Sequence, residues 1–310
     1  MKTEKPNPAL LAVAGVITCV TWSLASLLWF HLSQRVLGIS LFGLGLSLGP
    51  CLAAYAIVPK ARKQGARRVV LFVGGLAILV FSLASAVNLD MEGFFTLVFA
   101  GTMGAAIGHN LATVIVGPMF FGRLLCGWGC WRSMVLELLP IGPGKGRRRG
   151  GWTFLAFAGL AGTVGIGAWS AFATGHNAHV KSSTLRPAGL EPLVIGVGIY
   201  YAASIGLAFA LKDQRAFCKY LCPNSAILRV TSRFSLLKMS ADRALCNSCG
   251  ACSQACPMDI DVAKFAARGR RVASGDCILC QHCAHACPTG ALRLSVGWDI
   301  ARETPFIPRT

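Results

Sequence analysis

Long apolar runs separated by short polar segments fill the first two thirds of the chain. A membrane-spanning helix needs roughly 20 predominantly apolar residues. Runs of that length fall at about 9–30, 36–58, 69–89, 94–117, 152–172 and 193–211. The pattern predicts an all-α membrane domain of six transmembrane helices over residues 1–211. No convincing small-residue cleavage site follows the first run, so we expect a retained helix and not a signal peptide.

The positive charges between these runs predict an orientation. Lys and Arg gather at 60–68, between the second and third runs, and at 123–149, between the fourth and fifth. The other three connecting segments, including NLDMEG near residue 90, hold few cations or none. Cytoplasmic loops carry an excess of Lys and Arg. The sequence therefore predicts a multi-pass protein of the inner, cytoplasmic membrane, with both termini and everything after residue 211 in the cytoplasm.

Composition supports a membrane protein and argues against a nucleic-acid binder. The chain has 310 residues, of which 54% are hydrophobic and only 14% charged, whereas about 25% of the residues of a soluble domain are charged. The net charge of +18 would suit nucleic acid, but no basic groove with interleaved aromatic residues is present. We expect the lipid bilayer as a partner and no nucleic acid.

Two cysteine runs near the C-terminus carry the strongest chemical signal. Residues 246–257 read CNSCGACSQACP and residues 277–288 read CILCQHCAHACP. Both have the spacing C-x2-C-x2-C-x3-C-P of bacterial two-cluster ferredoxins, in which the fourth cysteine ligates the other cluster. The spacing predicts two [4Fe–4S] clusters, cluster I on Cys246, Cys249, Cys252 and Cys287, and cluster II on Cys277, Cys280, Cys283 and Cys256.

These runs predict an α+β ferredoxin domain at 240–295, followed by a tail at 296–310. Zinc sites and disulfides are the alternatives. A zinc site closes with four ligands and does not need the double pattern. Disulfides are rare in a cytoplasmic segment. The sequence thus favours an electron carrier.

A second pair of cysteine motifs lies at the predicted cytoplasmic border of the membrane. CGWGCW at 126–131 and CKYLCP at 218–223, the latter in a connector at 212–239, align as an internal repeat, R-x2-C-x3-C-x2-S-x2-L. Cysteines at i and i+4 share one face of a helix, so facing repeats would bring four thiols together. These thiols are Cys126, Cys130, Cys218 and Cys222. A third Fe–S cluster, a zinc ion, reduced thiols and a redox-active disulfide all remain open.

Polar residues inside membrane spans are costly and are therefore functional candidates. His109, within AAIGHNLATV in the fourth run, is the best candidate for a quinone site, because histidine can bond a carbonyl and move its proton. A histidine bonded to a neighbouring helix is the alternative. No two histidines lie at one depth on different predicted spans, which argues against a spanning haem.

The six runs, the paired C-x3-C motifs, the stretch RAFCKYLCP and the double ferredoxin run resemble the NapH-type family of membrane ferredoxin-type quinol dehydrogenases. The same elements are similar to the C-terminal part of NosR-type proteins and to CcoG. The family normally has proline after both C-x3-C pairs; here Pro223 follows Cys222, but Trp131 follows Cys130. The resemblance implies exchange with the quinone pool.

Together these patterns predict a membrane-bound iron–sulfur electron-transfer subunit. It would be an oxidoreductase subunit of the quinol dehydrogenase type that works with other redox subunits of a membrane complex. Electrons would pass between quinol and a redox partner through the two clusters and the four-cysteine site. The alternative is an assembly or maturation factor that supplies electrons or metal to a respiratory enzyme. A third hypothesis is that the protein anchors a larger complex in the membrane.

Overall fold

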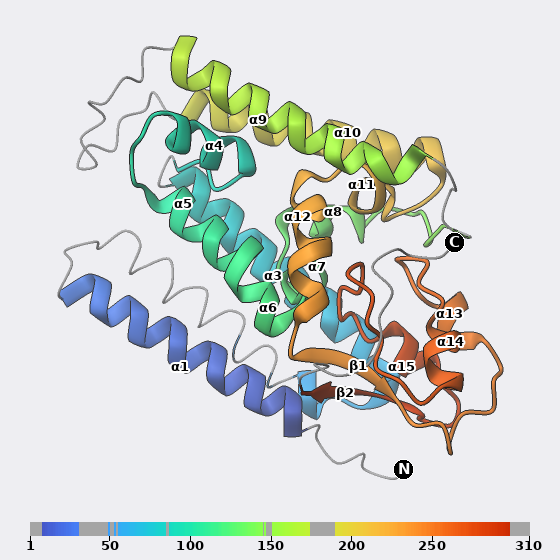
Figure 1. Ribbon diagram of the computed structural model, residues 1–310. Coiled ribbons are helices and arrows are strands. Elements are labelled where there is room, and N and C mark those ends of the chain that lie inside the picture. The colour runs from blue at the N-terminus through green and yellow to red at the C-terminus, as the bar shows by residue number, and fades with distance from the viewer. Residues whose placement is uncertain are drawn as a thin grey trace.

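The computed structural model describes residues 8–30, 49, 53, 55–84, 87–144, 146, 151–173 and 190–297. A body of apolar helices leads into a small C-terminal unit that holds the only described β-sheet (Figure 1). The short helices that carry the paired cysteine motifs lie between the body and this unit. The second predicted span, at 36–58, and the segment 174–189 lie mostly or wholly outside the described residues.

Apolar helices of membrane-spanning length support the predicted membrane protein. In the described part of the chain, three helical stretches are long and apolar enough to cross a bilayer: Lys60–Leu83, Leu155–Phe172 and Leu193–Leu211. They correspond to η1 (Lys60–Arg62) with α3 (Lys63–Ala84), α9 (Leu155–Ala173) and α10 (Leu190–Leu211). The first predicted span coincides with α1 (Pro8–Phe30), of which Ala14–Leu27 is a shorter apolar helix.

The predicted single span at 94–117 is not one helix. It is divided into α4 (Met91–Phe99), α5 (Ala105–Asn110), the π-helical turn η2 (Leu111–Val116) and α6 (Gly117–Phe121). Gly101 lies between α4 and α5 and has a φ of +65°. Glycine adopts this left-handed backbone without steric cost, so it allows the chain to turn here.

A second glycine, Gly122 at φ +60°, ends α6. The chain then turns through 96° into α7 (Leu124–Trp128) and α8 (Trp131–Leu136). The stretches on either side of the bend form either a fourth, broken span or a re-entrant loop. This bend carries the first cysteine pair back alongside α3, where a Cβ at Gly75 would lie 3.2 Å from the carbonyl oxygen of Cys130.

The segment before α4 also departs from expectation. It was predicted as an outer loop, remote from the cation-rich segments. Instead Asp90, at the start of α4, forms an ion pair with Arg132 of α8. Asn110 donates a hydrogen bond of 3.0 Å to the carbonyl oxygen of Leu89, so α5 holds this turn in place. The hydropathy pattern predicts which stretches are long and apolar enough to be helices. It does not predict that the short segment before α4 folds back against α8.

The C-terminal unit closes on a two-stranded sheet. The antiparallel strands are β1 (Leu237–Ala241) and β2 (Leu292–Val296), with Leu237 opposite Val296 and Ala241 opposite Leu292. Both cysteine runs lie between these strands in sequence, together with α13 (Ala251–Gln254), α14 (Val262–Ala267) and α15 (His282–Ala286). Upstream, α11 (Ala216–Tyr220), α12 (Pro223–Thr231) and η5 (Ser232–Phe234) connect α10 to β1. A further short helix, η3 (Gly151–Phe154), precedes α9.

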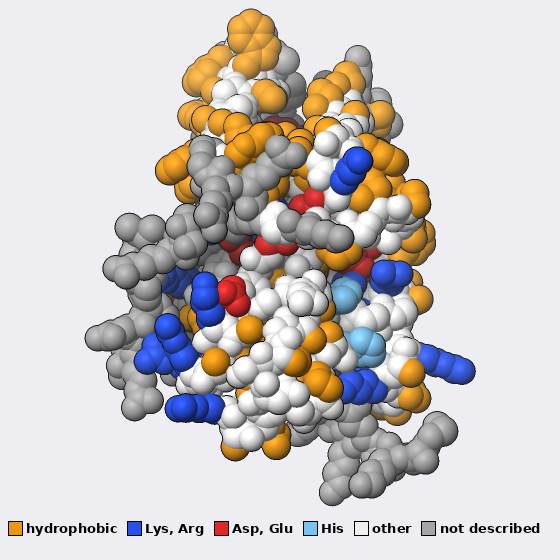
Figure 2. Space-filling view, turned by 90° about the vertical axis from the view of Figure 1, so that its right-hand side faces the viewer, with side chains coloured by type: hydrophobic (Ala, Val, Ile, Leu, Met, Phe, Trp, Pro, Cys, Tyr) orange, Lys and Arg blue, Asp and Glu red, His pale blue; other side chains and the backbone are white. Residues whose placement is uncertain are grey.

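Surface chemistry separates the two parts of the molecule. Apolar side chains gather at the upper end of the face in Figure 2, and Lys and Arg are most frequent on its lower half. On α9 and α10 large apolar residues are strongly exposed, such as Trp169 at 74% and Ile199 at 62%. Contiguous exposed apolar surface of this kind requires a bilayer or a partner. The apolar helices therefore supply the membrane-facing body, and the C-terminal unit lies beyond it.

Candidate functional site

The two ferredoxin runs adopt the same backbone turn. In the first run Ser248 and Gly250 have positive φ angles of 58° and 76°, and in the second Leu279 and Gln281 have 54° and 60°. Positive φ is uncommon for residues other than glycine, and such conformations cluster at functional sites. Each pair flanks the second cysteine of its run, so both runs curl into a tight loop. A short helix, α13 or α15, follows each loop.

This folding brings each predicted set of four thiols to one cavity. The first cavity is lined by cysteines together with apolar residues such as Met239 and Val272. Its cysteines are Cys256, Cys277, Cys280 and Cys283. The cysteines that line the second cavity are Cys246, Cys249, Cys252 and Cys287. In each cavity the fourth cysteine of one run joins the first three of the other. Four thiols around a small cavity are the donor set that a [4Fe–4S] cluster takes, so these residues fit that group.

The two cavities differ in exposure. Cys280 and Cys283 in the first are buried, whereas Cys249 in the second is exposed. Burial raises the pKa of Cys277 to about 12 and that of Cys256 to about 11. Because iron binds the thiolate, loading these cysteines would release protons. The set around Cys277 therefore occupies the more shielded site, and the set around Cys246 lies nearer to solvent.

The paired C-x3-C motifs also fold as a structural repeat. Cys126 lies in α7 and Cys130 immediately precedes α8; Cys218 lies in α11 and Cys222 immediately precedes α12. The expectation that each pair shares one face of a single helix was wrong, because a non-helical residue at Gly129 or Leu221 separates two short helices. The second cysteine of each pair has nearly the same backbone, with ψ of 121° and 120°.

The arginine of each repeat donates a hydrogen bond to the serine of the other repeat. Arg123 of the first repeat donates to Ser225 of the second at 2.9 Å, and Arg215 of the second donates to Ser133 of the first at 2.6 Å. All four side chains are almost fully buried. The alignment of the motifs had already matched Arg123 with Arg215 and Ser133 with Ser225, but it could not show that each arginine reaches the serine of the other repeat.

Positive charge surrounds the four thiols. Arg215 lies 4.0 Å from the Cys218 sulfur, and Arg132 lies 3.9 Å from the Cys222 sulfur. Buried guanidinium groups favour thiolates or an anionic group held by them. In the described part of the chain, no three His, Cys, Asp or Glu side chains lie close enough together to hold a single metal ion. This holds for the four-cysteine site and for the two ferredoxin runs alike.

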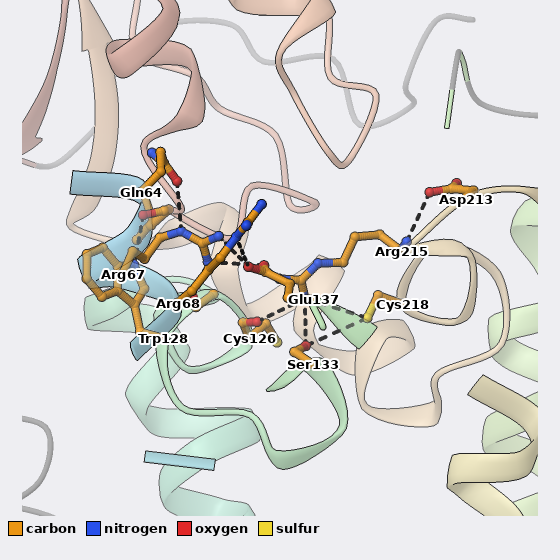
Figure 3. A network of polar contacts seen from close by, with 12 residues as sticks. Gln64, Arg67, Arg68, Cys126, Trp128, Ser133, Glu137, Asp213, Arg215 and Cys218 are labelled. Carbon is orange, nitrogen blue, oxygen red and sulfur yellow. Dashed lines mark hydrogen bonds and ion pairs between the residues drawn. The ribbon is translucent and has the colours of Figure 1, made fainter. Parts of the chain in front are cut away.

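Glu137 links this site to α3 through a buried ionic network (Figure 3). Its carboxylate pairs with Arg215 and with Arg67, whose side chain is 0% exposed. Arg67 also donates to the carbonyl oxygen of Gly127 at 2.9 Å. Sequence reasoning missed Glu137 because a single acid near a predicted loop gives no sign of its partners.

The four-cysteine site packs directly against the ferredoxin unit. Trp128, which is 1% exposed, donates its indole N–H to the carbonyl oxygen of Leu279 at 2.9 Å. A Cβ at Gly127 would lie 2.3 Å from the carbonyl oxygen of Ile278, so glycine allows the two backbones to touch here. This contact joins the residues after Cys126 to the loop between Cys277 and Cys280.

Ion pairs reinforce the same junction from two further directions. Arg123 pairs with Asp276 at 3.0 Å, next to Cys277. Lys219, fully buried beside Cys218, pairs with Asp213 at 2.7 Å and with Asp259 of the ferredoxin unit at 2.6 Å. The set of thiols around Cys277 thus lies against the four-cysteine site.

His109 lies apart from the thiols. It occupies α5 and is partly exposed. Among the described residues its imidazole ring makes no hydrogen bond, whereas its neighbour Asn110 is buried and donates hydrogen bonds to the carbonyl oxygens of Leu89 and Ala106. The structure therefore does not place His109 in the four-cysteine site.

Comparison with known proteins gives the family. A profile described as a 4Fe-4S dicluster domain matches residues 238–288, which include all eight ferredoxin cysteines. The methylamine utilization ferredoxin-type protein MauN of Methylorubrum extorquens is 31% identical over 206 residues, 63% of this chain and 67% of that protein.

Two shorter matches point the same way. The putative electron transport protein YccM of Escherichia coli is 30% identical over 113 residues, 36% of this chain. The ferredoxin-type protein NapH of Haemophilus influenzae is 30% identical over 96 residues, 29% of this chain. The match spans only 30% of YccM and 33% of NapH, and no solved structure matches the chain. From the dicluster domain and these relatives, the chain belongs to the NapH-type family of ferredoxin-type proteins, which transfer electrons on iron–sulfur clusters.

Proposed function

We propose that this protein carries electrons between the quinol pool and a redox partner, using two [4Fe–4S] clusters and a third iron–sulfur cluster at the four-cysteine site. The clusters would supply one-electron redox chemistry when bound. The chain's own residues hold them, shield them and set the charge around them. The observation that carries the proposal is the direct packing of Gly127 and Trp128 against Ile278 and Leu279.

The lining of the two cavities supports the predicted ligand sets. Cys246, Cys249, Cys252 and Cys287 would hold cluster I, and Cys277, Cys280, Cys283 and Cys256 would hold cluster II. Cys126, Cys130, Cys218 and Cys222 would hold the third cluster. Arg123, Arg132 and Arg215 would offset the negative charge of that cluster and its thiolates, because each lies beside at least one of the four thiols.

The predicted orientation fits this role. Lys60, just before α3, donates to the carbonyl oxygen of Cys287 at 3.3 Å, and Arg67 reaches Gly127. The cation-rich segment at 60–68 therefore lies at the same end of the body as the ferredoxin unit. Under the positive-inside rule that end is cytoplasmic, in the inner membrane. His109 remains a candidate contact for the quinone ring.

The test is reduction of the anaerobically purified protein by a short-chain menaquinol analogue, followed as bleaching of the iron–sulfur absorbance. We expect quinol to bleach the wild type. A variant with all four paired cysteines changed to serine should bleach with dithionite but not with quinol. Failure of quinol on a wild type that dithionite reduces would contradict the proposal. If the same protein then transferred copper or exchanged disulfides, the maturation-factor alternative would replace it.

A further inference from the structure

A group of charged and polar side chains lies inside the apolar body, next to the four-cysteine site. Arg132 of α8 pairs with Asp90, and both side chains are almost fully buried. Tyr200 of α10 donates its hydroxyl to Glu92 of α4 at 2.9 Å. The Arg132 guanidinium lies 3.9 Å from the centre of the Tyr200 ring, so the two pairs form one group. We call Asp90, Glu92, Arg132 and Tyr200 the α4–α10 polar group.

This group reaches the thiols through Arg132, whose guanidinium lies 3.9 Å from the Cys222 sulfur. Its other end lies between membrane helices. A Cβ at Gly196 of α10 would be 2.8 Å from a carboxylate oxygen of Glu92, and a Cβ at Gly167 of α9 would be 3.2 Å from the Glu92 carbonyl oxygen. The polar group therefore spans the distance between the apolar helices and the four-cysteine site.

Part of the hydrogen-bonding capacity of the group is unused. One Glu92 carboxylate oxygen and the Arg132 Nε are buried without a hydrogen-bond partner in the described structure. Buried polar atoms are rarely left unpaired, and an unpaired one calls for an explanation such as a catalytic role. Ionisable residues inside a membrane body are costly and mark proton relays or substrate paths.

We propose that Glu92, bonded to Tyr200, is the proton acceptor for quinol oxidation beside the four-cysteine site. This inference rests on the proposed function. Oxidation of a quinol to a quinone breaks two O–H bonds and releases two electrons and two protons. The electrons go to the chain's redox centres. The Glu92 carboxylate takes the first proton, gives it up to solvent, and then takes the second.

The surroundings of Glu92 suit this task. Asp90 faces it from the same turn, Arg132 from α8 and Tyr200 from α10, while α9 contributes glycine and backbone at the contact. Asp90 is already paired with Arg132, which leaves Glu92 as the carboxylate with a free oxygen. Tyr200 fixes the other oxygen and so orients the carboxyl group.

The test compares quinol-driven with dithionite-driven reduction in Glu92→Gln and Tyr200→Phe, with iron content measured in each. A positioned base contributes about 10²- to 10⁴-fold, so Glu92→Gln should slow quinol-driven reduction at least about 100-fold and leave the dithionite rate unchanged. Tyr200→Phe should slow it about tenfold, as expected for one hydrogen bond to a charged group. Tyr201→Phe is the matched control and should behave as wild type, since the Tyr201 hydroxyl donates to the Trp131 carbonyl oxygen, whereas the Tyr200 hydroxyl donates to Glu92.

An infrared readout makes the test independent of rates. In wild type, quinol-driven turnover should produce a carboxylic-acid band in the redox-difference spectrum that shifts with isotope-labelled glutamate. If quinol reduces wild type and both variants at equal rates, or if no glutamate band appears, the inference is overturned and the proposed function stands. If quinol fails to reduce wild type, the proposed function is overturned and the inference with it.

Discussion

Replacing Glu137 with leucine is expected to lower the thermal unfolding midpoint of the protein by on the order of 10 °C. Glu137 lies between two buried arginines, Arg67 and Arg215, with side chains 0% and 1% exposed. Removing one partner of a buried ion pair leaves uncompensated charge, which costs about 3–5 kcal/mol. Here two guanidinium groups would lose the same carboxylate.

Two further variants remove fewer or more exposed ion pairs and should have smaller effects on the unfolding midpoint. Arg67→Met leaves Glu137 paired with Arg215, so its midpoint should fall less than that of Glu137→Leu. Lys264→Gln removes an exposed pair with Asp261, whose side chains are 71% and 48% exposed, and exposed pairs contribute about 0–1 kcal/mol. Calorimetry in detergent measures all three. A Glu137→Leu midpoint as high as that of Lys264→Gln would show that the network does not stabilise the fold.

Replacing Cys256 with serine is expected to damage the cluster of the other run. Cys256 belongs to the first run in sequence but lines the cavity of Cys277, Cys280 and Cys283. Cys256→Ser should therefore alter the same electron paramagnetic resonance signal as Cys280→Ser, with loss of up to about four irons, one cluster's content.

The reciprocal exchange supplies the matched comparison. Cys287 lines the cavity of Cys246, Cys249 and Cys252, so Cys287→Ser should alter the same signal as Cys249→Ser. Redox titration of the four single variants assigns each signal by its midpoint potential. If Cys256→Ser resembled Cys249→Ser instead, the cross-ligation would be wrong, and each run would hold its own cluster.

The sequence predicted the elements whose signal is local. Apolar runs of sufficient length predicted α3, α9 and α10, because a helix that crosses a bilayer consists of one continuous stretch of mostly apolar residues. The spacing of the ferredoxin runs anticipated which thiols would share a cavity, because three cysteines on one tight loop cannot also reach the far side of a cluster. The R-x2-C-x3-C-x2-S repeat anticipated that two distant segments would fold alike.

Other features depend on contacts that no local pattern encodes. The run at 94–117 was predicted as one span, but Gly101 and Gly122 turn the chain and α4 folds back against α9. The partners of Glu137 and Arg132 lie about 40 to 80 residues away in sequence, so their ion pairs appear only after the helices have packed. For the same reason Asp90 and Glu92 were read as part of an outer loop.

The most direct test of the account is the iron and acid-labile sulfide content per chain of anaerobically purified protein. It should be measured in wild type and in the variant with Cys126, Cys130, Cys218 and Cys222 all changed to serine. Each [4Fe–4S] cluster contributes four irons, so three clusters give about twelve and two give about eight. We predict about twelve in wild type, falling to about eight in the variant. About eight irons in both proteins would contradict a third cluster at the four-cysteine site.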